Sequence, residues 1–109
     1  MKYFIVEKNN QLYHINQHDV YYVYTKNDAP HLVFYCTEDG EFYNRTTLKA
    51  LLEQKSYLFK RCHRSVIINL EKVKSLDPQK RLISFSRSIQ SVVASRRYFK
   101  TILEEFKAG

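Results

Sequence analysis

The stretch FKRCHRSVIINL, Phe59 to Leu70, sets the densest positive charge of the chain directly before an apolar run. Its first half carries a cluster of basic side chains, those of Lys60, Arg61, His63 and Arg64. Its second half contains the β-branched run Val66–Ile68, which predicts a short buried strand. Side chains that bind a ligand are often held at the ends of such rigid elements. The stretch therefore predicts β structure and, at one end of a strand, a candidate binding site.

The composition on either side of this stretch also favours β structure. The 109 residues include nine Tyr and seven Phe, with many Val and Ile, which suit a pleated and half-buried surface. Only two Gly and two Pro are present, so Asn, Asp and Ser must form most of the turns. A chain of this length has room for one core, and residues 1–109 are predicted to form a single domain.

Turn signals divide the chain into nine or ten short strands. The pair Asn9-Asn10 accepts positive φ and predicts a hairpin. The segment Thr25–His31 contains Asn, Asp and Pro, and is predicted to be a loop. The segment DPQK at 77–80, with Pro in second position, is predicted to be a turn. Besides the quoted stretch, strands are expected at Tyr3–Val6, Gln11–Ile15, Val20–Tyr24, 31–36, Glu41–Asn44, Lys72–Leu76, Leu82–Phe85 and Ser91–Val93.

Two segments have helical periodicity instead. A short helix is predicted at about 46–54, with Thr46 or Thr47 as N-cap and a leucine stripe on one face. A closing helix is predicted at about 96–106, with Ser95 as N-cap. The predicted fold is thus mostly β, with one short helix and one C-terminal helix.

Positive charge is concentrated in the second half of the chain. Residues 1–55 hold six basic and seven acidic residues, a net charge of −1. Residues 56–109 hold twelve basic and four acidic residues, a net charge of +8. Such a half-chain fits a polyanion, nucleic acid first and an anionic membrane second, but a basic surface that serves solubility fits equally well.

Signals for catalysis, cofactors and membranes are missing from the sequence. Cys62 and His63 are adjacent, so on a strand their side chains point to opposite faces and do not form a nucleophilic pair. No metal, nucleotide or hydrolase motif is present, so an enzyme, a metal and a cofactor are not expected. No signal peptide or membrane span is expected, and the chain is predicted to be cytoplasmic, with Cys36 and Cys62 reduced.

Basic clusters recur where predicted elements begin or end. One precedes the buried strand, Lys80 and Arg81 lie at a hairpin tip, and Arg96 and Arg97 open the last helix. Cations at a helix N-terminus are unfavourable by about 0.3–1 kcal/mol each. They are useful there if an external phosphate occupies the N-terminus and the arginines bind it or reach past it to a base. The alternative is that they simply point to solvent.

The blocks FKRCHRSVIIN (59–69) and VASRRY (93–98) together resemble the LytTR family. This family comprises the DNA-binding output domains of response regulators of the AgrA and ComE type, which control virulence, bacteriocin and competence genes, including quorum-sensing systems. The resemblance covers nearly the whole chain. It implies an elongated stack of small antiparallel sheets that reads duplex DNA with loops rather than with a recognition helix.

The resemblance also implies which residues contact DNA. His31, Arg64 and Arg97 are expected to read bases in the major groove, where an arginine can donate two hydrogen bonds to guanine. Contacts to phosphate are expected from Lys26, Lys49, Ser65, Arg81, Ser95 and Lys100. His63 and Cys62 are interpreted as packed scaffold residues, with redox sensitivity of Cys62 as the alternative.

The implied partner is double-stranded promoter DNA, with direct repeats and a homodimer on DNA as the expected arrangement. Met1 fits a stand-alone regulator or a fragment of a response regulator whose N-terminal receiver domain lies outside this chain, and we favour the fragment. Two rival functions stay open. One is a β module that binds single-stranded nucleic acid or RNA on its aromatic side chains. The other is a non-catalytic protein-interaction domain with a basic rim.

Overall fold

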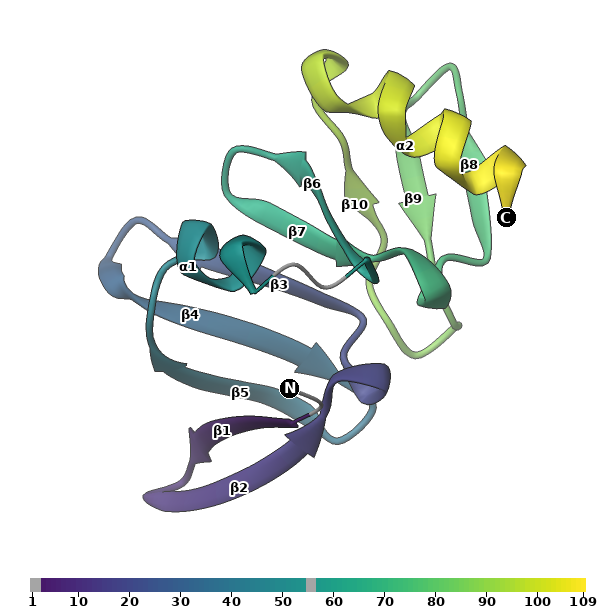
Figure 1. The fold of residues 1–109 in the computed structure, drawn as a ribbon. Coiled ribbons are helices and arrows are strands. Elements are labelled where there is room, and N and C mark those ends of the chain that lie inside the picture. The colour runs from purple at the N-terminus through teal and green to yellow at the C-terminus, as the bar shows by residue number, and fades with distance from the viewer. Residues whose placement is uncertain (1–2, 55–56) are drawn as a thin grey trace.

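The computed structural model describes residues 3–54 and 57–109, and within them the chain is mostly β, as predicted. Figure 1 shows two antiparallel sheets and two α-helices, α1 (Leu48–Glu53) and α2 (Arg96–Ala108). The strands are β1 (Tyr3–Lys8), β2 (Gln11–Asn16), β3 (Tyr22–Lys26), β4 (Ala29–Thr37), β5 (Gly40–Arg45), β6 (Phe59–His63), β7 (Val66–Asn69), β8 (Ser75–Asp77), β9 (Leu82–Ser84) and β10 (Val92–Val93). The shape is elongated, with extents of 40 × 24 × 24 Å. Met1 lies outside the described residues.

The larger sheet has seven strands in the order β2-β1-β5-β4-β3-β7-β6. Tight turns join most neighbours. Asn9 and Asn10 have φ values of 51° and 65°, which gives the predicted hairpin between β1 and β2. Two pairings join strands that are distant in sequence, β1 with β5 and β3 with β7, and the second sets Val23 opposite Ile67. The quoted stretch therefore completes the sheet, because it supplies both β6 and β7.

The smaller sheet has the order β10-β9-β8 and packs with α2 over one end of the larger sheet. Figure 1 shows these elements together to the right of β6 and β7. Asp77 caps the predicted turn before β9 by accepting hydrogen bonds from the N–H groups of Gln79 and Lys80. The small sheet and α2 thus form one unit beside the last strands of the larger sheet.

Two hydrophobic clusters fill the molecule. The first lies against α1 and is built on buried residues of β1, β3, β4, β5 and β7, with Val6, Val33 and Tyr35 fully buried. The second lies between β6, β7, the small sheet and α2, and includes Cys62, Ile68, Ile83 and Ile102. Because alternate residues of a strand face opposite ways, Ile67 enters the first cluster and Ile68 the second.

Asn69 is a buried polar side chain that holds the end of β7 in place. Its Nδ2 donates to the carbonyl of Val20 at 2.9 Å and to that of Gln17 at 3.3 Å. Its Oδ1 accepts from the N–H of Glu71 at 3.0 Å and so caps the short 3-10 helix Leu70–Lys72. This amide therefore ties β7 to the 3-10 helix Gln17–Asp19 and the segment before β3.

The predicted loop at 25–31 is wrong, because β3 runs to Lys26 and β4 begins at Ala29. Only Asn27 and Asp28 connect them. The pairing then breaks: Lys26 lies opposite Ala29, but Tyr24 lies opposite Phe34. Pro30 falls in this break, where its lack of an N–H does no harm. His31 therefore lies on an irregular part of a strand and not on a loop.

Smaller differences occur elsewhere. The third strand begins at Tyr22 rather than Val20, and the strand predicted over Lys72–Leu76 is β8, which starts only at Ser75. Thr47 caps α1 by accepting from the N–H of Ala50 at 3.0 Å. Ser95 has the backbone of an N-cap, but its hydroxyl makes no capping bond.

Candidate nucleic-acid interface

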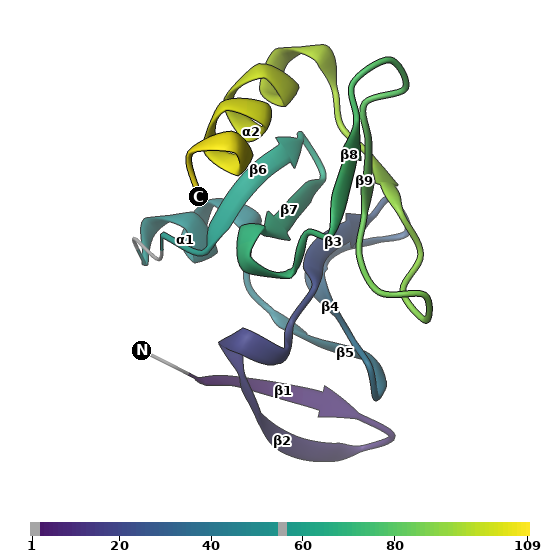
Figure 2. The ribbon, with the colours of Figure 1, turned by 90° about the vertical axis from the view of Figure 1, so that its right-hand side faces the viewer.

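Three basic segments that are distant in sequence lie along one edge of the molecule. They are the β3–β4 connection with its flanks (26–31), the β6–β7 turn (64–65) and the first turns of α2 (96–100), and we call them together the basic edge. This edge runs up the left side of Figure 1 and lies on the far side in Figure 2. The N–H of Thr25 donates to the carbonyl of Ser65 at 3.1 Å, and that of Ser95 to the carbonyl of Cys62 at 2.9 Å. The three segments are therefore fixed relative to one another.

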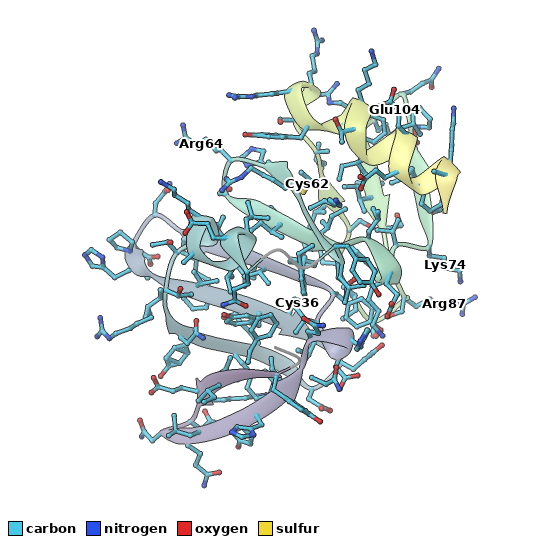
Figure 3. The ribbon with its side chains drawn as sticks, in the orientation of Figure 1. Cys36, Cys62, Arg64, Lys74, Arg87 and Glu104 are labelled. Atoms are coloured by element: carbon cyan, nitrogen blue, oxygen red, sulfur yellow. The ribbon has the colours of Figure 1, made fainter. Side chains whose placement is uncertain are left out.

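The β6–β7 turn is rigid and presents Arg64 outward. His63 Nδ1 accepts from the N–H of Ser65 at 3.2 Å, and the Ser65 hydroxyl lies 2.9 Å from the same nitrogen. The guanidinium of Arg61 donates to the carbonyl of Arg64 across the turn. Figure 3 shows the Arg64 side chain projecting into solvent, where it is exposed. His63 and Arg61 thus support the turn, and the Arg64 side chain is left exposed.

The N-terminus of α2 presents Arg97. The Arg97 guanidinium lies 5.4 Å from the centre of the Tyr98 ring, which restricts its motion while the side chain stays exposed. The N–H groups of Arg96 and Arg97 have no hydrogen-bond acceptor among the residues described. The Ser95 hydroxyl is buried without a partner in that same part of the chain. To contact a phosphate it would have to rotate outward.

The β3–β4 end contributes His31, which is exposed on β4. Lys26 is held back along the sheet, with Nζ 3.1 Å from a Glu41 carboxylate oxygen and 4.1 Å from the centre of the Phe34 ring. Burial raises the pKa of Glu41 despite this cation. Because exposed ion pairs are worth about 0–1 kcal/mol, a phosphate can compete for Lys26.

Lys49 and Arg45 flank the same end of the sheet. Arg45 pairs with Leu32, directly after His31, and α1 follows with Lys49 in its first turn. Both side chains are exposed. Arg45 was missed by sequence reasoning, although a lone cation at the end of a predicted strand was a usable signal.

The nine predicted contact residues fall into two groups. Five have exposed side chains that make no hydrogen bond or ion pair with any described residue: His31, Arg64, Arg97, Lys49 and Lys100. In the other four the side chain is bonded or buried: Lys26 is bonded to Glu41, Ser65 to His63 and Arg81 to Ala94, and the Ser95 hydroxyl is buried without a partner among the described residues. Arg81 has φ of 52° and donates from Nε to the Ala94 carbonyl at 3.1 Å, so it braces the segment before α2. All three predicted base-reading residues belong to the exposed group.

No group of three or more metal-ligating side chains occurs within residues 3–54 and 57–109. None of the helices described has the length and apolarity to cross a membrane. Burial raises the pKa of the Cys62 thiol to about 12 and also raises that of Cys36. These thiols are free in the structure.

We expect Cys62 to resist alkylation in the folded protein. Its side chain is fully buried, and with a pKa of about 12 only about one thiol in ten thousand is ionised at pH 8. Mass spectrometry after iodoacetamide treatment should find Cys36, which is partly exposed, modified first. Urea should then expose Cys62. Equal rates for the two thiols in the folded protein would contradict this placement.

Known proteins resemble this chain in sequence profile and in fold. The chain matches the profile of the LytTr DNA-binding domain over residues 10–107. Its structure is similar to that of the LytTr DNA-binding domain of a Bacillus cereus response regulator, with a TM-score of 0.81 and 20% identity over 94% of this chain and 97% of that one. No curated protein matches the chain. The chain thus belongs to the LytTR family of DNA-binding domains.

Proposed function

We propose that residues 1–109 act as one domain that reads a specific sequence in double-stranded DNA. His31, Arg64 and Arg97 contact bases in the major groove, and the domain serves a bacterial transcription regulator or is the output domain of a two-component response regulator. The observation that carries the proposal is the basic edge. Its three exposed side chains that can read bases lie on segments held together by backbone hydrogen bonds. None of these side chains makes a hydrogen bond or an ion pair with a described residue.

The dimensions of the molecule support binding along a duplex. The long axis of the molecule, 40 Å, exceeds one turn of B-DNA, about 34–36 Å, so the molecule is long enough to span successive major grooves. The excess of positive charge supplies affinity that does not depend on sequence. Phosphate contacts come first from Lys49 and Lys100. Lys26, Ser65 and Arg81 follow as they release their present partners, and Ser95 as its hydroxyl rotates outward.

The expected target is promoter DNA with direct repeats, to which two copies bind side by side. A receiver domain N-terminal to this chain would control that binding. No catalytic step and no cofactor is required, because base and phosphate contacts are made by side chains alone.

The test is a competition between duplex and single-stranded oligonucleotides after selection of binding sites from random duplexes. We expect one duplex sequence to be enriched and the corresponding single strands to compete poorly. Equal competition by single strands would favour the single-strand or RNA-binding alternative. Absence of any salt-dependent binding to nucleic acid would favour a protein-interaction domain and overturn the proposal.

Replacing Lys100 by glutamine should lower affinity for all duplexes alike. Lys100 is exposed on α2 one turn after Arg97, where it can neutralise one phosphate. Loss of one phosphate contact lowers the slope of log K against log salt by about one, and leaves the ratio between target and unrelated DNA unchanged. Lys107→Gln, an exposed lysine in the last turn of the same helix, is the matched control. A changed ratio for Lys100→Gln, or an equal slope change for Lys107→Gln, would argue against this role.

A further inference from the structure

The seven-stranded sheet ends in two very different edges. The outer side of β6 faces α2, and β6 carries two cations, one of which, Lys60, pairs with Glu105 of α2 at 3.3 Å. At the opposite end of the sheet, no strand in residues 3–54 and 57–109 pairs with the outer side of β2. Natural proteins protect open edges with lysine, proline, bulges or covering elements. The β2 sequence QLYHIN has no lysine, proline or carboxylate, and its six residues pair with β1 without a bulge.

The side chains of this hairpin are also unusually apolar for an exposed surface. Leu12 is 72% exposed and Ile5 is 56% exposed, and they lie on the face of the hairpin that points away from the first hydrophobic cluster. Tyr13, on the other face, is 36% exposed. An open edge with apolar neighbours of this kind accepts another strand.

We infer that β2 pairs with β2 of a second copy of this chain, antiparallel and across a twofold axis at His14. The hairpin register determines which backbone groups are free. In a hairpin with a two-residue turn the closing pair, Lys8 and Gln11, is hydrogen-bonded, so the N–H and C=O groups of Leu12, His14 and Asn16 point away from β1. Those groups pair Leu12 with Asn16 of the second copy, and His14 with His14 of the second copy.

The side chains fit this register. On the face of the first cluster, Tyr13 lies opposite Ile15 of the second copy, an aromatic–β-branched pair of the kind that stabilises sheets. The charges also favour a second copy over a charged partner. The segment Tyr3–Asn16 holds one acidic and one basic residue, Glu7 and Lys8, in a chain of net charge +7. This is therefore the part of the molecule where two copies approach with little repulsion.

Antiparallel pairing has a geometric consequence that rests on the proposed function. The basic edge lies at the ends of strands, and the twofold axis, perpendicular to the sheet, reverses every strand of the second copy. The two basic edges then face opposite directions. Such a dimer holds two separate duplex segments, whereas two copies on neighbouring repeats of one duplex do not need this contact.

Sedimentation of the full chain without DNA tests the pairing itself. We expect a monomer–dimer equilibrium, and concentration-dependent protection of the Leu12 and His14 amides from hydrogen exchange. Leu12→Lys should raise the dissociation constant of the dimer by at least about tenfold, as edge lysines oppose pairing. His14→Pro, which removes an outward N–H, should do the same. Ile5→Lys is the matched control. It adds the same charge on the same face of the hairpin, but on β1, which lies between β2 and β5 and has no open edge.

A protein that stays monomeric at millimolar concentration, or a dimer that dissociates with Ile5→Lys but not with His14→Pro, would overturn the inference. Capture of a fluorescent duplex by a second, immobilised duplex tests the bridging step. A dimer that binds no DNA would refute the proposed function and leave the β2 contact standing. A dimer that binds DNA without bridging two duplexes would refute the opposed orientation of the basic edges and the antiparallel β2 register that requires it. The proposed function would stand.

Discussion

Arg64→Ala is expected to abolish the preference of this domain for its target sequence while leaving its fold intact. The guanidinium is exposed and makes no bond within the described chain, so its removal leaves no buried group unsatisfied. A bidentate contact to guanine is worth about 1–3 kcal/mol of discrimination, which corresponds to about 5- to 150-fold in the ratio of target to unrelated DNA. The affinity for unrelated duplex should fall only by as much as the loss of one positive charge causes.

Arg87→Ala is the control for this substitution. Arg87 is also exposed, but Figure 3 shows it on the opposite side of the molecule from Arg64. Both variants lose one charge, and only Arg64→Ala should change the ratio. Titration of labelled target and scrambled duplexes at two salt concentrations measures both effects. If Arg64→Ala binds its target as tightly as the parent protein, Arg64 does not read a base.

Asn69→Asp is expected to cost about 3–5 kcal/mol of stability at neutral pH, although the two side chains have nearly the same shape. Asn69 Nδ2 donates to two carbonyl oxygens, and an aspartate would place a buried, unpaired negative charge against them. The bond that Oδ1 accepts from Glu71 would survive. The loss therefore combines the two lost donor bonds with the cost of burying a charge.

The pH dependence gives this prediction a second readout. A protonated aspartic acid can still donate to the Val20 carbonyl, so the fold raises the pKa of the introduced carboxyl above its unfolded value of about 3.9. A carboxyl with a raised pKa binds its proton more tightly in the folded state. The deficit relative to the parent should thus be smallest at acid pH and grow as pH rises above about 4. Urea denaturation at pH 4 and pH 7 checks this. Asn27→Asp, in the exposed β3–β4 turn, should change stability by no more than about 0.5 kcal/mol at either pH.

Local chemistry explains which parts of the fold could be predicted from the sequence. Asn9-Asn10 specified a hairpin because few other pairs accept two positive φ values. The helix at 46–54 and the turn at 77–80 were also readable, since their caps act over two or three residues. Pro30 led to the wrong prediction of a loop at 25–31. A proline is tolerated in this strand because the hydrogen-bond ladder between β3 and β4 is broken there. That break is a tertiary feature, which the sequence does not show.

The sequence was sufficient to predict the exposed residues of the candidate site. It was not sufficient to predict that other candidate residues bond to partners within the fold. Arg64 and Arg97 stand beside recognisable blocks of sequence, and nothing in the fold competes for them. The engagement of Lys26 by Glu41 and of Arg81 by Ala94 links residues thirteen to fifteen positions apart. Such contacts depend on how strands and loops pack against each other, which residue spacing does not encode.

The pairing of β3 with β7 also has a consequence for the growing polypeptide. While the ribosome makes the first half of the chain, the strands β1 to β5 can already form hairpins, but the side of β3 that will carry β7 stays open, with Tyr22, Val23 and Tyr24 along it. That vulnerable interval ends only when residues 66–69 emerge. The stretch that carries Arg64 is therefore also the one that closes the nascent sheet against misassociation.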